Sequence, residues 1–208
     1  MIDLAAIANA SLVPEPFPHL TAKNVLNLRQ LAEIAADFPP ITKPGIFPPS
    51  ELKFGPAFAR LLESIESEEL ERLIEEKFGI GLAKLPLMIT VRGFCRNADG
   101  RIHNDSKDKV VTCLLYLNDP DWPDEGGRLR LLRSGTDLDD VIAEVPPNGG
   151  NFVAFRRTDN SWHGHAPFEG PRRYIMFNWL ASDFALVKNV GRHKLSAAFK
   201  RLDLLGDH

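Results

Sequence analysis

Two histidines and one aspartate are the residues of this chain whose types and spacing could do chemistry. His103 and Asp105 are separated by one residue, and His163 follows about sixty residues later. Two imidazoles and one carboxylate can hold a divalent iron on one face and leave the opposite positions open for a co-substrate and oxygen. Residues i and i+2 of a strand point the same way, so His103 and Asp105 could grip one ion while Asn104 faces away. The pattern predicts an iron site made of His103, Asp105 and His163.

A pair of arginines could supply an anion site beside this metal. Arg172 and Arg173 begin the run Arg-Tyr-Ile-Met-Phe-Asn-Trp, which is typical of a buried strand. A buried guanidinium is costly unless it meets an anion, and its planar fork suits a carboxylate. Adjacent residues of a strand face opposite sides, so we expect only one of the two arginines to reach the site.

Several segments in a fixed order resemble the Fe(II)/2-oxoglutarate-dependent oxygenases, specifically their prolyl-hydroxylase-like branch. A His-x-Asp pair alone is a weak signal, but the ordered set is a strong one, and the resemblance extends over roughly residues 88–182. The segments that carry it are Arg101–Asp105, Val111–Asn118, Glu125–Leu131, Asn151–Phe155, Ser161–Gly164 and Arg173-Tyr174.

The resemblance implies roles for individual residues. His103, Asp105 and His163 would bind Fe(II), and Arg173 would form a two-pronged salt bridge with the distal carboxylate of 2-oxoglutarate. Arg173 is preferred because it precedes Tyr174 and lies six residues before Trp179, as the family's arginine does. Arg172 is then expected to be a solvated neighbour.

Three further residues are expected in the co-substrate pocket. Tyr116 occupies the position at which relatives place a tyrosine that hydrogen-bonds the same carboxylate, and Thr112 and Leu129 are candidates for the pocket wall. The chain departs from prolyl hydroxylases at Phe177, where those enzymes can supply a threonine hydroxyl. This departure concerns the details of the carboxylate cage and not the arginine.

The activity that the resemblance implies is oxygen-dependent hydroxylation of an unactivated C–H bond. Fe(II) would be the cofactor and 2-oxoglutarate the co-substrate, with release of succinate and CO2. The substrate cannot be deduced, because specificity depends on loops. A peptidyl proline, another protein side chain, a sugar and a small metabolite all remain candidates.

Two other functions fit parts of the sequence. His163, His165 and Glu169 match part of the cupin metal motif, which would give an isomerase or a dioxygenase independent of 2-oxoglutarate, although Arg157 and Met176 replace the flanking glycines of that motif. A non-catalytic binding module on the same barrel is the second alternative. On an extended strand His165 would lie roughly 6 to 7 Å beyond His163, so we expect His163 to be the ligand.

Composition describes an ordinary globular protein. The chain has 208 residues, 44% of them hydrophobic and 25% charged, and a formal charge of -3 that gives no reason to expect a nucleic acid or membrane partner. Cys95 and Cys113 lie in apolar runs and are expected to be free thiols in a reducing cytoplasm. The apolar run 4–13 has no preceding basic residue and is too short for a typical signal peptide.

Hydrophobic periodicity changes once along the chain and predicts its organisation. We expect one domain over residues 1–208, with mainly helical support in 1–86, a β core in 87–182 and a docked helix in 183–208. A short edge strand is expected in 15–23, and a hairpin at Asn97–Gly100 just before His103. The strand-like runs are 87–95, 110–117, 128–132, 151–156 and 173–180. Many short strands with turns between them favour a mainly β protein with flanking helices, a jelly-roll or cupin-like double-stranded β-helix.

Overall fold

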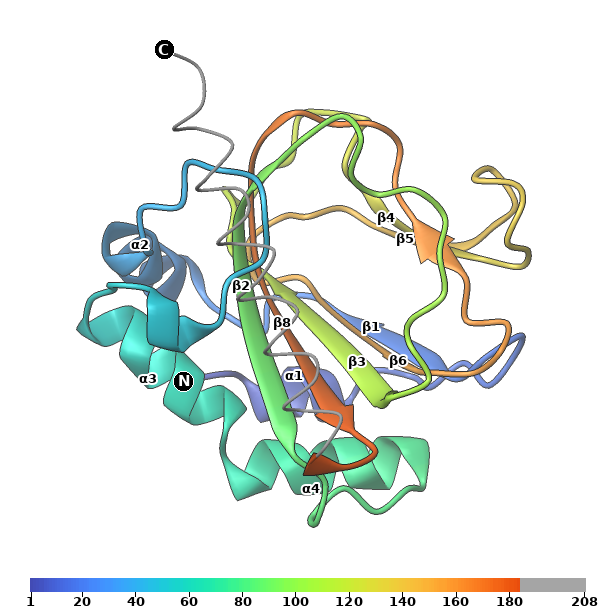
Figure 1. The fold of residues 1–208 in the computed structure, drawn as a ribbon. Coiled ribbons are helices and arrows are strands. Elements are labelled where there is room, and N and C mark those ends of the chain that lie inside the picture. Colours follow the sequence, from blue (N-terminus) through green and yellow to red (C-terminus); the bar gives the residue numbers. More distant parts are fainter. Residues whose placement is uncertain (184–208) are drawn as a thin grey trace.

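The computed structural model describes residues 1–183 of the chain. Its helical elements are α1 (Leu4–Ala8), α2 (Leu28–Asp37), the 3-10 turn η1 (Pro49–Glu51), α3 (Pro56–Ile65) and α4 (Glu68–Phe78). Its strands are β1 (His19–Ala22), β2 (Leu87–Cys95), β3 (Lys109–Tyr116), β4 (Leu129–Leu132), β5 (Val141–Val145), β6 (Phe152–Arg156), β7 (His163–Gly164) and β8 (Gly170–Leu180) (Figure 1). Helices therefore dominate before β2 and strands follow it, as the periodicity predicts.

The strands form two antiparallel sheets. The large sheet has five strands in the order β1-β6-β3-β8-β2, and the small sheet has three in the order β5-β4-β7. The expected strand near residue 20 is present as β1, at the edge of the large sheet. Two facing antiparallel sheets with connections that cross between them form the jelly roll. The predicted fold class, mainly β with flanking helices, is confirmed.

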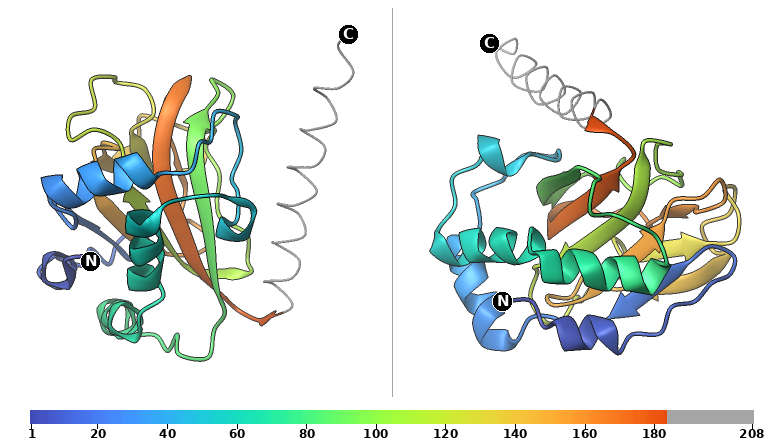
Figure 2. Two further views of the ribbon diagram at one scale, coloured as in Figure 1. Left: turned by 90° about the vertical axis from the view of Figure 1, so that its left-hand side faces the viewer. Right: turned by 90° about the horizontal axis from the view of Figure 1, so that it is seen from below.

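The helices cover one face of the large sheet, and the small sheet faces the other (Figures 1 and 2). Phe58 of α3 and Ile74 of α4 belong to the same core as Phe177 and Trp179 of β8. A second core fills the space between the sheets. It consists of Phe17, Leu114, Tyr116, Leu129, Leu131, Val145, Val153, Phe155 and Tyr174.

Strand β8 contributes to both cores because successive side chains of a strand point to opposite faces. Ile175, Phe177 and Trp179 pack in the core on the helix side, whereas Tyr174 packs between the sheets with Met176 beside it. Even-numbered residues of β8 therefore face the interior of the jelly roll. This alternation decides which arginine can reach the predicted site.

Local signals in the sequence account for the ends of α4. The Ser67 hydroxyl accepts a hydrogen bond from the Leu70 amide at 3.3 Å and caps the first turn. Gly79 ends the helix with a φ of 61°, in the left-handed region that glycine adopts without steric cost. The helix therefore begins and ends where Ser67 and Gly79 predict.

Among the elements that were not predicted are α1 and β5. Helix α1 has five residues, too few for a helical period to show in the sequence. Strand β5 lies at the edge of the small sheet and is largely half-buried, so it lacks the apolar run of a central strand. The predicted final helix in 183–208 stays a prediction, because the residues after 183 lie outside the described part of the chain. Within residues 1–183, no helix is long and apolar enough to cross a membrane.

Candidate metal centre

The three predicted ligands come from two segments that lie side by side. His103 and Asp105 are in the connection between β2 and β3, and His163 begins β7. The expected strand over residues 103–105 is reduced to an isolated antiparallel bridge between His103 and His163. Candidate ligand atoms of all three residues nevertheless lie within 4.8 Å of one another. The structure brings the predicted ligand set together.

Both histidine rings are oriented by backbone carbonyl groups. His103 Nδ1 lies 2.9 Å from the Arg101 carbonyl oxygen, and His163 Nδ1 lies 3.0 Å from that of Ser161. A carbonyl can only accept, so each Nδ1 must carry the proton. In the neutral form of each ring, Nε2 then keeps its lone pair, which is the form of imidazole that binds a metal.

Both carboxylate oxygens of Asp105 are engaged. Lys109 Nζ lies 2.6 Å from Oδ1, and the Thr112 hydroxyl lies 2.6 Å from Oδ2. Burial alone would raise the pKa of Asp105, but the neighbouring Lys109 and His163 and the two hydrogen bonds hold it well below its usual value. Asp105 is therefore an anion at neutral pH.

His163 is the neutral partner of this anion. Its side chain is almost fully buried, and burial lowers its pKa to about 4, although nearby Asp105 acts in the opposite direction. At neutral pH the three candidate ligands therefore include at least one neutral imidazole, that of His163, and one carboxylate, that of Asp105. A divalent metal needs its ligands in these deprotonated forms.

A cavity of about 230 Å³ opens beside these residues between the two sheets. His103, Asp105 and His163 contribute to its wall, together with cationic and apolar side chains. The remaining lining residues are Ile46, Arg92, Gly100, Lys109, Thr112, Leu114, Leu129, Gly164, His165, Arg172, Tyr174 and Met176.

Arg172 lies in the wall of this cavity. Its side chain is 2% exposed, its Nε donates to the Gly127 carbonyl at 2.7 Å, and its Nη2 donates to the Tyr116 hydroxyl at 3.2 Å. The guanidinium carbon lies 5.3 Å from the ring centroid of Tyr116 and 5.1 Å from that of Tyr174. The residue expected to be solvated is thus enclosed in the site.

Arg173 points to the other side of β8. Its guanidinium carbon lies 5.2 Å from the ring centroid of Phe38, after the end of α2, and the residue is not part of the cavity wall. Of the two arginines, the structure therefore places Arg172 in the cavity wall, and the expectation that Arg172 is solvated is wrong. The prediction relied on the distance from Arg173 to Trp179, but Trp179 faces the helices, and residues of the same parity share that face.

The other three expected pocket residues lie around the cavity. Thr112 and Leu129 contribute to its wall, and the Tyr116 hydroxyl accepts a hydrogen bond from Arg172, which lines the cavity. Burial raises the pKa of Tyr116 to about 12, although Arg172 opposes this shift, so the hydroxyl keeps its proton at neutral pH. Their roles toward 2-oxoglutarate remain predictions.

His165 lies in the same cavity but outside the group of candidate ligands. Its Nδ1 is 2.8 Å from the Ala166 carbonyl oxygen, and its Nε2 is 3.9 Å from the sulfur of Cys95. Glu169, the third member of the cupin pattern, is exposed. Among the described residues, the structure groups His163 with His103 and Asp105 and not with the cupin set.

Sequence reasoning missed two cations of the cavity. Lys109 binds Asp105, and Arg92 forms an ion pair with Asp99 at 2.7 Å while its Nε is buried without a hydrogen-bond partner in the described chain. A charged residue inside an otherwise apolar strand run was the available signal for Arg92. Lys109 carried no comparable signal, because a lysine at the start of a strand is usually solvated.

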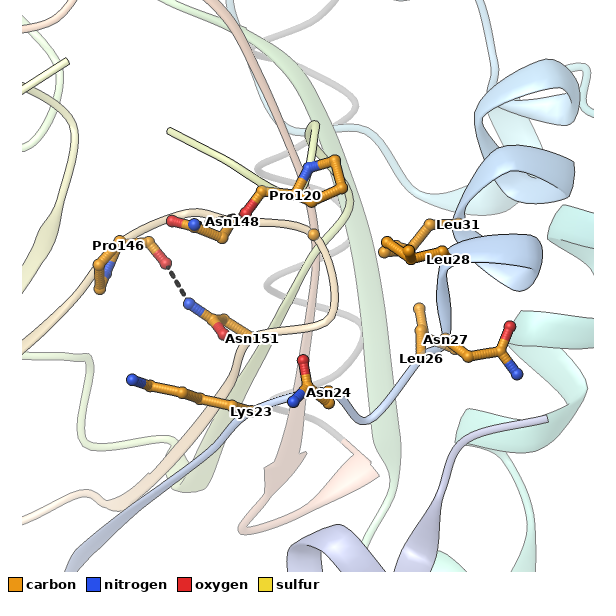
Figure 3. Close-up of a pocket in the computed structure, with 11 residues that line it drawn as sticks. Lys23, Asn24, Leu26, Asn27, Leu28, Leu31, Pro120, Pro146, Asn148 and Asn151 are labelled. Atoms are coloured by element: carbon orange, nitrogen blue, oxygen red, sulfur yellow. Dashed lines mark hydrogen bonds between the residues drawn. The ribbon is translucent and has the colours of Figure 1, made fainter. Parts of the chain in front are cut away.

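A second cavity, of about 430 Å³, lies between the segment before α2 and the loop before β6 (Figure 3). Lys23 is the one ionisable residue in its wall, beside several asparagines, leucines and prolines. This wall contains no histidine, cysteine or carboxylate. The three candidate ligands line the cavity beside His163 and not this second cavity.

Comparisons with known proteins agree with this assignment. Residues 93–181 match the family model described as the 2OG-Fe(II) oxygenase superfamily, a segment that contains His103, Asp105, His163 and Arg172. A sequence comparison with curated proteins found no match.

Similar solved structures share the fold at low sequence identity. A prolyl-4-hydroxylase from Pseudomonas putida is 20% identical, with a TM-score of 0.60, over 85% of this chain and 98% of that one. The viral collagen prolyl hydroxylase of Paramecium Bursaria Chlorella virus-1, in complex with 2-oxoglutarate, is 15% identical, with a TM-score of 0.53, over 77% of this chain and 93% of that one. HygX from Streptomyces hygroscopicus, with nickel and 2-oxoglutarate bound, is 14% identical, with a TM-score of 0.53, over 79% and 82%. Over residues 93–181 the chain is therefore similar to the 2OG-Fe(II) oxygenase superfamily, and its fold is that of the prolyl hydroxylases named above.

Proposed function

We propose that His103, Asp105 and His163 bind Fe(II), and that Arg172 binds the distal carboxylate of 2-oxoglutarate for hydroxylation of a substrate C–H bond. The observation that carries this proposal is the shared cavity. A three-donor group and a buried guanidinium line the same 230 Å³ space between the sheets.

The donor set fits Fe(II). With Nδ1 of each ring at a carbonyl, both histidines in their neutral form turn Nε2 to the metal, and Asp105 is ionised, which makes the two-histidine, one-carboxylate face used by non-haem Fe(II) oxygenases. Three protein donors would leave the remaining positions of the ion for 2-oxoglutarate and oxygen. When bound, Fe(II) with 2-oxoglutarate and oxygen supplies the oxidant for C–H hydroxylation and releases succinate and CO2.

Arg172 supports the second half of the proposal. Within residues 1–183 its partners are a carbonyl and a hydroxyl oxygen, and no carboxylate forms an ion pair with it. A guanidinium that is 2% exposed and lacks an anion is destabilising, so the site favours a ligand that brings a carboxylate. The Tyr116 hydroxyl accepts from Arg172 and keeps its own proton, which it can donate to the same carboxylate.

The protein also keeps water away from this part of the site. Leu114, Leu129 and Tyr174 belong to the core between the sheets and line the cavity. Phe155 packs against the ring of His163 with a centroid distance of 4.8 Å. Apolar walls lower the local dielectric and strengthen the charge interactions of Arg172 and Asp105.

Peptidyl proline is the first substrate to test, because two of the similar structures are prolyl hydroxylases. Other protein side chains, sugars and small metabolites are further candidates. Cys95 and Cys113 are buried and free, which is consistent with our proposal that the protein works in the reducing cytoplasm.

The experiment that tests the function measures 2-oxoglutarate binding and succinate release by the Fe(II)-loaded protein. We expect one 2-oxoglutarate per chain, bound only when a divalent metal is present, and slow succinate release that a true substrate accelerates. A panel of prolyl peptides, sugars and metabolites would then be screened by this acceleration. Binding of 2-oxoglutarate that does not depend on metal would refute the proposed site.

A further inference from the structure

The two ligand-bearing segments share little regular structure. His103 N donates to His163 O at 2.9 Å, and His163 N donates to His103 O at 3.0 Å. β7 contains two residues, and residues 104–106 are neither helix nor strand. A third backbone bond joins His165 N to Gly100 O at 2.8 Å. These three backbone hydrogen bonds do not by themselves hold three ligand side chains within the narrow tolerance of about 0.5 Å that a metal site needs. Other contacts must position these segments.

Asn104, between the two predicted ligands of the first segment, makes such contacts. Its Nδ2 donates to the Thr158 carbonyl at 2.7 Å, and its Oδ1 accepts from the Ser161 hydroxyl at 2.7 Å. Both ends of the amide are therefore bound to the turn that precedes His163. An amide held at both ends has one orientation, which fixes the backbone between His103 and Asp105.

Ser161 connects this amide to the second histidine. Its hydroxyl is fully buried and binds Asn104, and its backbone carbonyl accepts from His163 Nδ1 at 3.0 Å. The Ser161 hydroxyl also accepts from the Thr158 amide at 3.0 Å, so the turn itself is closed. One serine therefore fixes the His163 ring and the segment that carries the other two ligands.

The turn is anchored at two further points. Arg157 Nε donates to the Asp105 carbonyl at 3.2 Å, and Asn160 Nδ2 donates to the Pro16 carbonyl at 2.7 Å. Together with the two hydrogen bonds of Asn104, the bond from Arg157 makes three side-chain links between this turn and the segment that carries His103 and Asp105. The bond from Asn160 ties the outer side of the turn to the loop before β1 and leaves the ligands untouched.

We propose that Asn104 and Ser161 are positioning residues that hold the metal ligands in register across the two segments. This inference rests on the proposed metal site. Asn104 faces away from the metal, and its contribution is to transmit the fixed position of the Ser161 turn to His103 and Asp105. Partners that orient metal ligands typically contribute ten- to a hundredfold to metal affinity when they are removed.

The test compares Co(II) binding by the purified full-length chain and three variants. Asn104→Ala removes both amide contacts, Ser161→Ala removes only the hydroxyl, and Asn160→Ala is the matched control in the same turn. We expect Asn104→Ala and Ser161→Ala to bind Co(II) about ten- to a hundredfold more weakly by calorimetry. Asn160→Ala should stay within about twofold of the unaltered chain, because it cuts the links to the Pro16 carbonyl and the Thr158 hydroxyl and removes no contact of Asn104 or Ser161.

Two further readouts separate positioning from a general loss of stability. The visible spectrum of Co(II) at saturation should change in Asn104→Ala and Ser161→Ala but not in Asn160→Ala, since it reports ligand geometry. The double variant should lose little more affinity than Asn104→Ala alone, because Asn104→Ala already removes the hydrogen bond that joins it to Ser161. Fully additive losses, or an unchanged spectrum with unchanged affinity, would overturn the inference.

The same titrations distinguish a failure of the proposed metal site from a failure of the positioning role. If the unaltered chain does not bind Co(II), the metal site itself is refuted. If it binds Co(II) and Asn104→Ala binds equally well, the positioning role alone fails. Should Asn104→Ala not fold, Ser161→Ala decides the question, because it removes a single buried oxygen and leaves the backbone and volume almost unchanged.

Discussion

Replacing Arg172 with methionine tests the assignment of the 2-oxoglutarate site most directly. Methionine retains an unbranched side chain that can fill the space between Tyr116 and Tyr174, where the guanidinium now lies 5.3 Å and 5.1 Å from the two ring centroids. The variant removes the positive charge that we propose faces the distal carboxylate. Removing one partner of a buried charge pair costs about 3 to 5 kcal/mol, and the lower end of this range corresponds to roughly a hundredfold in affinity.

The measurement is calorimetric titration of 2-oxoglutarate into the Mn(II)-loaded chain, which binds the co-substrate without turnover. We expect Arg172→Met to raise the dissociation constant of 2-oxoglutarate about a hundredfold and to leave Mn(II) affinity within a few-fold. Arg173→Met is the matched control. Its guanidinium lies over the ring of Phe38 on the helix side of β8, so its loss should cost at most about 1 kcal/mol of stability and no co-substrate affinity. Equal losses at the two positions, or a larger loss at Arg173, would refute the assignment from strand alternation.

Three further predictions concern the ligands. Asp105→Ala should abolish stoichiometric Fe(II) binding, because the site loses its only carboxylate; unchanged iron content by metal analysis would exclude this aspartate as a ligand. His163→Ala should abolish metal-dependent 2-oxoglutarate binding while His165→Ala retains it, and the reverse result in the same titration would restore the cupin reading. The metal-free protein should lose stability as the pH falls from about 6.5 to 4, since burial lowers the pKa of His163 and of His165 to about 4 and the unfolded chain takes up these protons first. Each histidine contributes up to ~3 kcal/mol to this loss, at about 1.4 kcal/mol per pKa unit. A free energy of unfolding, measured with urea, that does not change between these pH values would contradict the burial of both rings.

The order of elements follows from local signals. Ser67 and Gly79 mark the ends of α4. The two prolines after Phe38 prevent α2 from continuing. The strands from Leu87 onward appear as almost continuous apolar runs because one face of the large sheet packs on helices and the other on the small sheet. Elements with few residues or exposed faces, such as α1 and β5, leave no such pattern and were missed.

The candidate metal ligands were found from residue type, from order and from the resemblance that the ordered segments carry. His103, Asp105 and His163 could therefore be selected without coordinates. The expected strand around His103 was not needed for this result. The structure replaces it with a single bridge and brings the same three side chains together.

By itself, the sequence determined the class of fold, the three candidate ligands and the presence of an arginine near them. Only the tertiary structure decided that Arg172 and not Arg173 faces the cavity, because a shift of one residue along a strand reverses the face and leaves the local pattern almost unchanged. It also decided that Asn104 binds Ser161 and that Lys109 binds Asp105. These partners are specified by the packing of segments far apart in the chain, and hydrogen bonds between such segments leave no periodic trace in the sequence.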